Sequence, residues 1–276
     1  GVCHSGINRI VSAETYIGEE DMKLLIQWPR NKYLNVWVCS DASGAAGYSL
    51  YPGSVNGSDN SAMDGIVIQA TYTGSIGTSN NFRSRVLTHE IGHWLNLRHL
   101  WGNSNSPGEE DNCDNDDNVS DTPNSKGWTV CNLEGISCGS LDNVQNYMEY
   151  AYCGRMFTEG QKTRLRTAAL SSVAQRNQLS TQANLIATGL EGDPLLCEAT
   201  FSVDEHVICV GDSIHFIDES FHDVNNWSWD FADGSTISGS EEGIHNDLYH
   251  IFNAAGTYEV VLTASNGFES LASVPT

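Results

Sequence analysis

Apolar residues in the first 100 positions follow a strand-like pattern in short runs and then change to helical spacing. The runs at 33–39, 46–51 and 65–71 either alternate apolar with polar residues or have a continuous apolar centre, which is typical of strands. A further strand is expected at 6–11, and acidic residues followed later by Pro29 indicate a helix at 21–28. Between Val86 and Leu95 apolar residues recur at three- and four-residue spacing, which predicts an amphipathic helix.

The pattern weakens between residues 101 and 150 and then returns in two forms. An irregular segment of this length is compatible with a compact domain only if disulfides or bound ions hold it. Thr158 and Gln161 form a capping box, so a helix is expected over 158–179. Beyond residue 197, five period-two runs separated by turns predict an antiparallel β-sandwich, and they begin at Phe201, Ile208, Ile214, Trp227 and Tyr258.

A cluster of metal-binding residue types lies in and just after the helix predicted before residue 96. His89 and His93 are four residues apart, so they share one helix face and can bind the same metal ion. Glu90 can then reach a metal-bound water without binding the metal itself. His99 can join them only if the chain turns near Asn96, a residue type that tolerates positive φ. Three neutral imidazoles leave one tetrahedral position of zinc open, as in catalytic sites.

The charge and cysteine content limit the possible setting and partners of the protein. The net charge of −22 excludes a basic nucleic-acid-binding face, and solubility alone is sufficient to explain it. No apolar run is long enough to cross a membrane, so membrane insertion is not expected; no signal peptide opens the chain, so its start is expected to be a processed or trimmed end. The eight cysteines have no metal-finger spacing and predict disulfides in a secreted protein, with reduced cytosolic thiols as the alternative.

Residues 113–122 are rich in aspartate and asparagine. Their side-chain oxygens are hard ligands that suit calcium. The spacing differs from that of an EF-hand loop. From composition alone, a solvated acidic loop and a calcium site are equally compatible with this segment.

Five motifs together resemble the pappalysin family of metzincin zinc peptidases, in its secreted bacterial branch. The motifs are His-Glu-x-x-His-x-x-Asn-x-x-His, with Asn96 where the family has glycine, Trp101-Gly102, Asp121-Thr122-Pro123, Asn-Tyr-Met-Glu-Tyr at 146–150 and Phe157-Thr158-x-x-Gln161. The resemblance covers residues 1–180 and implies an α+β metzincin-type fold with a zinc helix, a mixed sheet and an irregular lower lobe. The zinc is expected between the lobes. The family's first strand, helix and strand are not found before Gly6, so either the chain is a fragment, with part of the upper sheet missing, or that segment is supplied otherwise.

The resemblance also implies roles for individual residues. Met148 would form a hydrophobic floor beneath the metal, and the Tyr150 hydroxyl would move between the zinc and the transition-state oxyanion. The implied disulfides are Cys113–Cys138 and Cys131–Cys153. The implied calcium ligands are Asp117, the Val119 carbonyl and Thr122, with Asp116 and Asp121 as further candidates.

The C-terminal part resembles a polycystic-kidney-disease-type (PKD) domain, through Trp227-Ser228-Trp229-Asp230-Phe231-Ala232-Asp233-Gly234 and Gly256-Thr257-Tyr258. The predicted division is therefore a peptidase domain at 1–188, a linker at 189–197 and an immunoglobulin-like all-β sandwich at 198–276. The expected partner of the PKD-like domain is another protein or a polysaccharide. Cys197 and Cys209 flank the first strand of this domain and are expected to pair, and Cys3 is expected to pair with Cys39.

These features predict a secreted zinc endopeptidase that acts on polypeptides. Glu90 would take a proton from the metal-bound water as it attacks the scissile carbonyl and would return it to the leaving amine. The substrate is expected to add a strand to the edge at 47–50, which includes Gly47 and Tyr48. Family members that cut before Lys or Arg have an acidic residue at the base of the S1′ pocket, where this chain has Gly154 followed by Arg155. A preference for apolar or acidic P1′ residues is therefore expected.

Two alternatives use the same observations. A non-catalytic adhesin with a decayed peptidase domain is disfavoured because all three histidines and Glu90 are intact. Another metzincin branch is disfavoured by the Asn-Tyr-Met-Glu-Tyr and Asp-Thr-Pro motifs.

Overall fold

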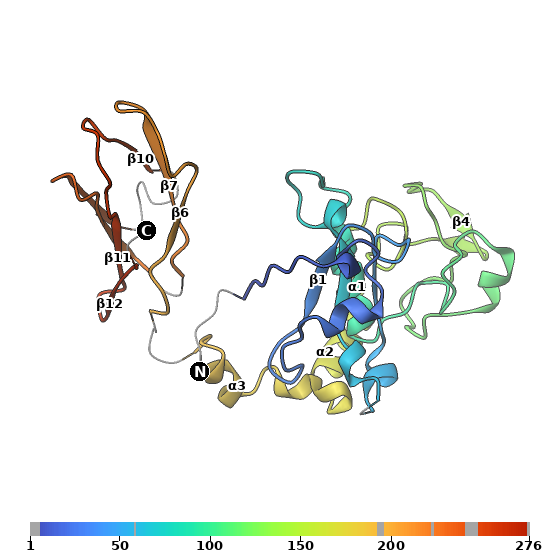
Figure 1. Cartoon of the computed structure of the whole chain (residues 1–276). Coiled ribbons are helices and arrows are strands. Elements are labelled where there is room, and N and C mark those ends of the chain that lie inside the picture. Colours follow the sequence, from blue (N-terminus) through green and yellow to red (C-terminus); the bar gives the residue numbers. More distant parts are fainter. Residues whose placement is uncertain (1–5, 58, 192–195, 222–223, 241–247, 275–276) are drawn as a thin grey trace. The chain divides into compact units, whose positions relative to one another are not determined.

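The computed structural model describes residues 6–57, 59–191, 196–221, 224–240 and 248–274. These residues form two compact units (Figure 1). One is Ile10–Asn184, and the other is Leu185–Thr276 together with the described residues before Ile10. Among the described residues, no helix has both the length and the apolar character needed to cross a membrane.

The first unit contains a three-stranded mixed sheet in the order β1-β3-β2. The strands are β1 (Val36–Cys39), β2 (Gly47–Ser49) and β3 (Ile66–Gln69). β1 runs parallel to β3, and β2 runs antiparallel to β3 at the edge of this sheet. Helix α1 (Arg85–Trp94) packs on one face, where a Cβ atom at Gly47 would lie 3.2 Å from Val86 Cγ1. The absence of a side chain at Gly47 therefore lets the helix approach the sheet closely.

The opposite face of the sheet is covered by the chain that precedes it. Met22, Trp37 and Val67 form a buried cluster there with Cys39 and Ala42. The expected helix at 21–28 is a shorter 3-10 helix, Glu20–Leu24, whose N-cap has no side-chain hydrogen bond. The strand expected at 6–11 does not form. Among the described residues no strand pairs with it, and Val11 is fully exposed. The other 3-10 helices of this region are Ala13–Thr15, Pro52–Val55, Ser61–Met63 and Ala70–Tyr72.

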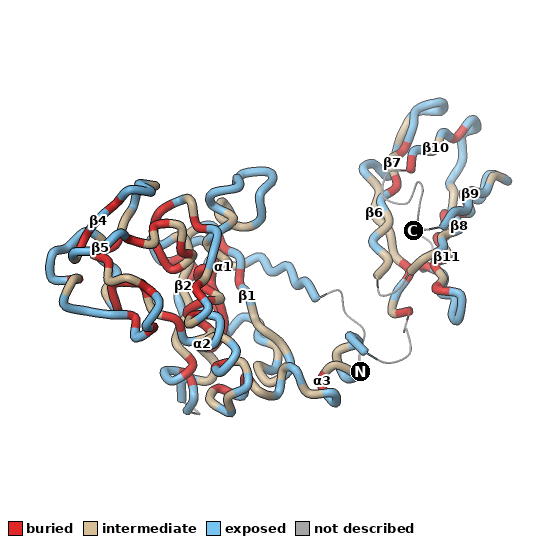
Figure 2. The backbone as a smooth tube through the Cα atoms, turned by 180° about the vertical axis from the view of Figure 1, so that it is seen from behind, coloured by how far each residue is buried: buried red, intermediate tan, exposed pale blue. Residues whose placement is uncertain are grey.

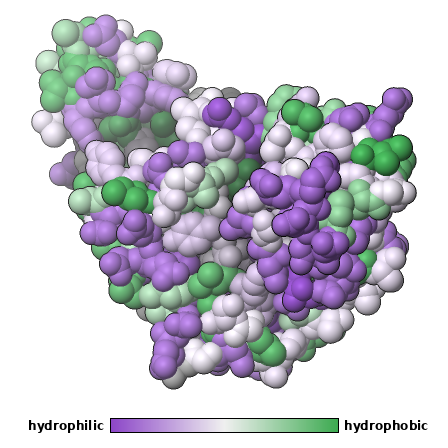
Figure 3. All heavy atoms as spheres, turned by 90° about the vertical axis from the view of Figure 1, so that its right-hand side faces the viewer, coloured by the Kyte–Doolittle hydropathy of each residue, from purple (hydrophilic) through white to green (hydrophobic). Residues whose placement is uncertain are grey.

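The segment from residue 100 to 157 is irregular, as its lack of periodicity predicts. It lies to one side of α1 in the views of Figures 1 and 2 and contains only the 3-10 helix Glu110–Asp114 and two short strands, β4 (Ile136–Ser137) and β5 (Ser140–Leu141). Hydrophilic side chains cover much of its outer face in Figure 3. The disulfides Cys113–Cys138 and Cys131–Cys153, which the family resemblance implied, are both present. Each closes a loop of 25 or 22 residues and stabilises the folded state by about 3 kcal/mol.

The long helix expected over 158–179 is divided in the structure. Helix α2 covers Glu159–Ala169 and begins with the predicted capping box of Thr158 and Gln161. A 3-10 segment, Val173–Gln178, follows, in which Ala174 and Gln175 have positive φ. This kink turns Arg176 into the interior, where it pairs with Asp64. Helix α3 (Gln182–Ala187) follows and ends just before the linker predicted at 189–197. Residues 192–195 of that linker lie outside the described residues.

The second unit contains the predicted antiparallel β-sandwich. One sheet has the order β10-β7-β6 and the other β12-β11-β8-β9. Their facing sides bury Phe216, Trp229 and Phe231, and Figure 2 shows buried positions along both sheets. The strands are β6 (Phe201–Val203), β7 (Ser213–Asp218), β8 (Asn226–Asp230), β9 (Thr236–Ser240), β10 (Leu248–Ile251), β11 (Val261–Ser265) and β12 (Ser270–Ala272). The run expected from Ile208 is a turn, and the run expected from Tyr258 begins as a strand only at Val261.

Two predicted disulfides are wrong. Cys39 is a free thiol buried in the core beside β3, with its Sγ 3.2 Å from the Asp41 carbonyl oxygen, and Cys3 lies outside the described residues. Cys209 is also free and is exposed in a turn closed by the Asp212 amide, whereas Cys197 is disulfide-bonded. The first strand that the two cysteines were expected to flank does form, as β6, but they do not pair across it.

Candidate metal centre

Helix α1 and the turn that ends it bring the three histidines together. His89 and His93 lie one helical turn apart on α1, and both are buried. The helix ends in a Schellman motif, in which the Leu97 amide donates to the Gly92 carbonyl and the Asn96 amide donates to the His93 carbonyl. Asn96 has φ of 71°, the left-handed conformation that its position in the motif requires. The reversal places His99, which is 2% exposed, against the two helical histidines.

The ring nitrogens of the histidines show which atoms are available to a metal. Each Nδ1 lies within hydrogen-bond distance of a backbone carbonyl: His89 with Tyr147 at 2.7 Å, His93 with Leu97 at 2.8 Å and His99 with Ser104 at 2.9 Å. A carbonyl only accepts, so each Nδ1 carries the proton and each Nε2 presents a lone pair.

The three Nε2 atoms face one another with no proton between them. His99 Nε2 lies 3.3 Å from His89 Nε2 and 3.1 Å from His93 Nε2. Tetrahedral zinc with nitrogen ligands at about 2.0–2.1 Å separates its ligand atoms by about 3.3 Å, so the donor set fits zinc. Burial, with mutual repulsion of the histidines, lowers the pKa of His89 to about 3 and of His99 to about 2. The neutral form that binds metal is therefore favoured.

Glu90 is buried on the same helix and contacts the edge strand. Ser49 Oγ on β2 lies 3.0 Å from Glu90 Oε2 and 2.9 Å from the Glu90 carbonyl oxygen. Burial raises the pKa of Glu90 to about 8, and the Ser49 hydrogen bond opposes this shift. A cation at the histidines would oppose it further. Oε2 has the serine as a partner, which leaves Oε1 available to a reacting group.

Met148 forms the floor of this region. Its side chain is fully buried with Leu97, Leu100 and Trp101. A side chain at Gly92 would overlap the Met148 sulfur, so glycine is required where the turn passes beneath α1. The turn itself is held by Asn146, whose Oδ1 accepts from the Met148 amide at 2.9 Å and whose Nδ2 donates to Gln161 Oε1 at 2.8 Å.

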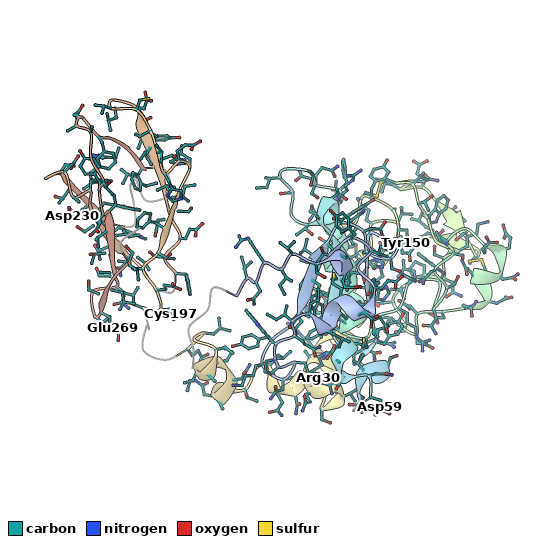
Figure 4. All side chains as sticks on the ribbon, in the orientation of Figure 1. Arg30, Asp59, Tyr150, Cys197, Asp230 and Glu269 are labelled. Carbon is teal, nitrogen blue, oxygen red and sulfur yellow. A yellow bond between two sulfur atoms is a disulfide. The ribbon has the colours of Figure 1, made fainter. Side chains whose placement is uncertain are left out.

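Aromatic side chains surround the histidines. Trp101 stacks on His99 at a ring distance of 4.7 Å, and Tyr150 lies 4.9 Å from His99 and 5.6 Å from His89. Tyr150 is labelled in Figure 4, between α1 and the irregular loops. Burial, with the nearby charge of Glu90, raises the pKa of Tyr150 to about 12, so its hydroxyl keeps its proton. Tyr51 contacts His93 edge-on at 5.5 Å.

A second group of oxygens lies in the acidic loop. Thr122 Oγ1 is 2.7 Å from Asp117 Oδ1 and 2.6 Å from the Val119 carbonyl oxygen. Asp117 is 1% exposed, and its Oδ2 is buried with no hydrogen-bond partner among the described residues. Burial raises the pKa of Asp117 to about 6, and the adjacent Asp116 adds to the shift. A buried carboxylate oxygen without a partner fits a cation.

The remaining predicted site residues lie apart from these clusters. Asp121 caps α2, with Oδ1 accepting from Thr158 Oγ1 at 2.7 Å and Oδ2 accepting from the Gly160 amide at 2.8 Å. The Tyr48 side chain turns away from α1 and donates to the Gly18 carbonyl. Gly154 is buried against Tyr147, and Arg155 is exposed.

Comparison with known proteins identifies the first unit. Residues 18–170, more than half of the chain, match the sequence model of peptidase family M43, described as pregnancy-associated plasma protein-A. The chain belongs to the pappalysin family. Residues 198–274 of this pappalysin match the PKD domain, as their pattern of strands and turns predicts.

Relatives of this pappalysin are named as extracellular enzymes. An extracellular metalloprotease of Neurospora crassa is 36% identical over 152 residues, which cover 52% of this chain and 50% of the relative. One of Arthroderma otae is 31% identical over 156 residues, which cover 54% of this chain and 56% of the relative. The chain thus spans about half the length of the curated relatives it matches. These names agree with the secreted setting expected from the cysteines.

A solved structure of mature mirolysin from Tannerella forsythia, in complex with a cleaved peptide, is also similar. It is 33% identical, covers 57% of this chain and 60% of its own, and gives a TM-score of 0.49.

Sequence reasoning did not find Ser49, which contacts Glu90, or Tyr51, which contacts His93. Both lie within the run predicted as a strand at 46–51. The alternation of that run places Gly47 and Ser49 on one face, and the close approach of α1 at Gly47 explains why Ser49 meets Glu90. The period-two pattern could have suggested Ser49 only if the position of the helix had been known.

Proposed function

We propose that this pappalysin is a secreted zinc endopeptidase that hydrolyses polypeptides. The observation that supports it best is the convergence of three neutral imidazole Nε2 atoms beside a buried glutamate. His89, His93 and His99 would hold the zinc. When bound, zinc supplies a Lewis acid that increases the acidity of water and polarises a substrate carbonyl.

Glu90 is proposed as the proton carrier of the reaction. Because Ser49 bonds Oε2, Oε1 is free to take a proton from the attacking water. Burial raises the pKa of Glu90, so the carboxyl group can hold this proton until it returns it to the leaving amine. The edge of β2 would align an extended substrate through backbone hydrogen bonds, since β2 pairs with β3 on one side only in the described sheet.

The proposal is tested by mapping cleavage of a denatured protein mixture by mass spectrometry. We expect internal peptide bonds to be cut, activity to be lost with 1,10-phenanthroline, which removes zinc in preference to calcium, and activity to return with added zinc. Failure to cut any protein while zinc is bound would favour the non-catalytic adhesin.

The same map tests the proposed specificity. Gly154 offers no carboxylate beneath a basic P1′ side chain, and Arg155 adds a like charge nearby. We expect apolar or acidic residues after the scissile bond. A clear majority of cuts before Lys or Arg would contradict this specificity without affecting the assignment of the reaction.

Tyr150 is proposed to stabilise the oxyanion through its hydroxyl. Tyr150→Phe is expected to lower kcat by about a hundredfold, the usual effect of removing an oxyanion donor, with little change in KM. Steady-state kinetics on one peptide would measure both constants. Tyr152→Phe is the matched control, because its ring packs on Phe82 instead of the histidines. A kcat for Tyr150→Phe within about twofold of the parent value would exclude the role.

Calcium is proposed at Asp117, the Val119 carbonyl and Thr122, with Asp116 as a further ligand. The support is the buried Asp117 oxygen that lacks a partner among the described residues. Both carboxylate oxygens of Asp121 are engaged at the N-terminus of α2, so Asp121 would contribute indirectly, by fixing the end of the loop.

Calcium added to metal-free protein already reloaded with zinc is expected to raise the melting temperature of the first unit. Saturation at a hundredfold excess over Kd corresponds to about 2.7 kcal/mol of stabilisation. Differential scanning calorimetry would measure the shift, and Asp117→Asn should reduce it strongly. If calcium stabilises the parent and Asp117→Asn equally, the site lies elsewhere.

The proposal keeps the predicted domain limits: a peptidase domain at 1–188, a linker at 189–197 and a PKD-like domain at 198–276. It also keeps the predicted partner of the PKD-like domain, which is another protein or a polysaccharide. Ser and Thr side chains dominate a shallow hollow on the outer face of the β8–β9–β11 sheet, and Trp227 also lines it. Such a surface is compatible with either partner.

A further inference from the structure

Arg164, in the middle of α2, joins two segments that are separate in the sequence. Its Nε donates a hydrogen bond to the Asn96 carbonyl at 2.8 Å, in the turn that ends α1. Its Nη1 donates to the carbonyls of Asp117 and Asn118, at 3.1 and 3.3 Å, in the acidic loop at 113–122. The Arg164 side chain is partly buried. One guanidinium group therefore bridges the turn that leads to the third histidine and the loop proposed to bind calcium.

On the side of the turn, Arg164 holds a single peptide unit. The Asn96 carbonyl and the Leu97 amide belong to the same planar unit, and this amide donates to the Gly92 carbonyl of α1 at 2.8 Å. A hydrogen bond at each end therefore fixes the orientation of the unit. The Leu97 carbonyl in turn accepts from His93 Nδ1 at 2.8 Å. The course of the chain after α1 and the orientation of the His93 ring both depend on how this unit is held.

On the side of the loop, Arg164 holds a second peptide unit in the same way. The Asn118 carbonyl accepts from Arg164 at one end of this unit. At its other end, the Val119 amide donates to Asp117 Oδ1 at 2.9 Å. Asp117 Oδ2 is the buried oxygen that has no hydrogen-bond partner among the described residues. A cation bound by the Asp117 carboxylate would therefore hold one end of the peptide unit whose other end is held by Arg164.

The acidic loop also packs against the chain that follows the third histidine. The Gly102 amide donates to the His99 carbonyl at 2.9 Å, and Gly102 has φ of 88°. A Cβ atom at Gly102 would lie 3.2 Å from Asn115 Cβ and 3.5 Å from the Asp116 carbonyl oxygen. The loop is thus connected to the chain before His99, through Arg164, and contacts the chain after it.

We propose that Arg164 is a positioning residue that couples the acidic loop to the zinc site. Calcium bound at Asp117 fixes the loop and, through Arg164, the turn that places His93 and His99, so zinc binds more tightly. Zinc then strengthens calcium binding by the same factor, because coupling between two sites is reciprocal. Direct repulsion between the two cations has the opposite sign, so tighter binding identifies the bridge. The inference rests on the zinc and calcium sites of the proposed function and needs no turnover.

The test measures the zinc affinity of the full chain in the Glu90→Gln background, which prevents self-cleavage during the titration. Metal-free protein is titrated with zinc against a fluorescent zinc indicator, in calcium-free buffer and in calcium-saturated buffer. We expect calcium to lower the Kd for zinc by about tenfold, a typical coupling between two sites. Calorimetric titration of calcium with and without zinc should give the same factor. A factor of one, or weaker zinc binding in calcium, overturns the coupling.

Arg164→Gln in this background should bind zinc with the same Kd in both buffers, because the guanidinium fork that spans the two segments is lost. Arg166→Gln is the matched control, since it makes the same charge change at an exposed position on α2, and it should keep the tenfold factor. If Arg164→Gln keeps that factor as well, the bridge is wrong. An equal loss of zinc affinity in both buffers, with the factor unchanged, would show that Arg164 is only structural.

A second variant covers the case in which Arg164→Gln does not fold, as judged by circular dichroism. Arg164→Lys keeps the charge and loses the planar fork, so it should reduce the factor by which calcium lowers the Kd for zinc. An unchanged factor in Arg164→Lys overturns the bridge.

Failure of the coupling and failure of the proposed function are separable. If both metals bind and the parent cleaves peptides, but calcium does not alter the Kd for zinc, only the coupling is wrong. If the coupling is found and the parent cleaves nothing, the peptidase function is wrong and the coupling stands. If either metal does not bind, the coupling is overturned together with that metal site.

Discussion

Glu90→Gln is expected to reduce peptide hydrolysis by at least about a thousandfold, because the amide cannot take and return the proton. The variant should bind zinc as the parent does. Glutamine has nearly the same shape and can still accept a hydrogen bond from Ser49, and the three histidines are unchanged. Turnover would be followed with a quenched fluorescent peptide, and zinc content by atomic absorption.

The control for this variant is Glu159→Gln, which removes an exposed carboxylate at the start of α2. It should retain full activity. Residual hydrolysis by Glu90→Gln within about tenfold of the parent would exclude Glu90 as the proton carrier. A parallel loss of zinc would instead assign Glu90 a role in holding the metal site together.

The second large effect is expected at the buried ion pair behind α1. Asp64 bonds Arg176 through both carboxylate oxygens, at 2.6 and 2.7 Å, and its Oδ1 also accepts from Trp94 Nε1 at 2.9 Å. Arg176 lies 3.8 Å above the Trp94 ring, and Arg30, labelled in Figure 4, lies 3.7 Å from Asp64 Oδ2. These contacts connect three separate segments to the last residue of the helix that carries His93.

Asp64→Asn is expected to lower the free energy of unfolding of the first unit by about 3–5 kcal/mol, because it leaves the buried Arg176 charge without a carboxylate partner. Differential scanning calorimetry should show this as a lower transition temperature for the first unit, and the transition of the β-sandwich would serve as an internal reference. The double variant Asp64→Leu/Arg176→Met should recover part of the loss, because the Arg176 charge is then removed as well, and Arg30 keeps its hydrogen bonds to the Val55 carbonyl and Gln175.

Glu110→Gln is the matched control, since it breaks an ion pair with Lys126 in which the Glu110 side chain is 84% exposed. Its effect should stay below about 1 kcal/mol. If Asp64→Asn is equally mild, the buried pair does not stabilise the unit. If both transitions shift together, the effect of Asp64 is not confined to the first unit.

The spacing of residues along the chain was sufficient to predict the structure where that structure depends on residues close together in the sequence. The helix at 85–94 follows from apolar residues three and four apart, and the turn after it follows from the tolerance of Asn96 for positive φ. The β-sandwich follows from period-two runs separated by turns. The same spacing also predicted a metal centre, since residues four apart on a helix meet whatever the rest of the chain does.

The spacing of residues along the chain gave wrong predictions where the local structure depends on residues far away in the sequence. The apolar residues at 6–11 have no partner strand among the described residues, so they form no strand, and Ile7, Ile10 and Val11 stay exposed. The helix expected over 158–179 breaks because Arg176 reaches Asp64, more than 100 residues away, and the Ala174 amide bonds Asn56 Oδ1. The pairing of Cys197 with Cys209 was inferred from their positions on either side of one strand, but Cys209 is a free thiol in an exposed turn and Cys197 is disulfide-bonded without it.

The sequence by itself determined which chemical groups this protein can bring to a metal: three imidazoles, one carboxylate and a phenol. It could do so because the spacing of the imidazoles and carboxylate is set within one helix and the turn after it, and the phenol is part of a short motif. Only the tertiary structure decided what surrounds these groups. Ser49 meets Glu90 because β2 packs against α1, and Tyr51, two residues beyond β2, meets His93. Such contacts join segments far apart in the chain, and no local pattern records the packing that brings them together.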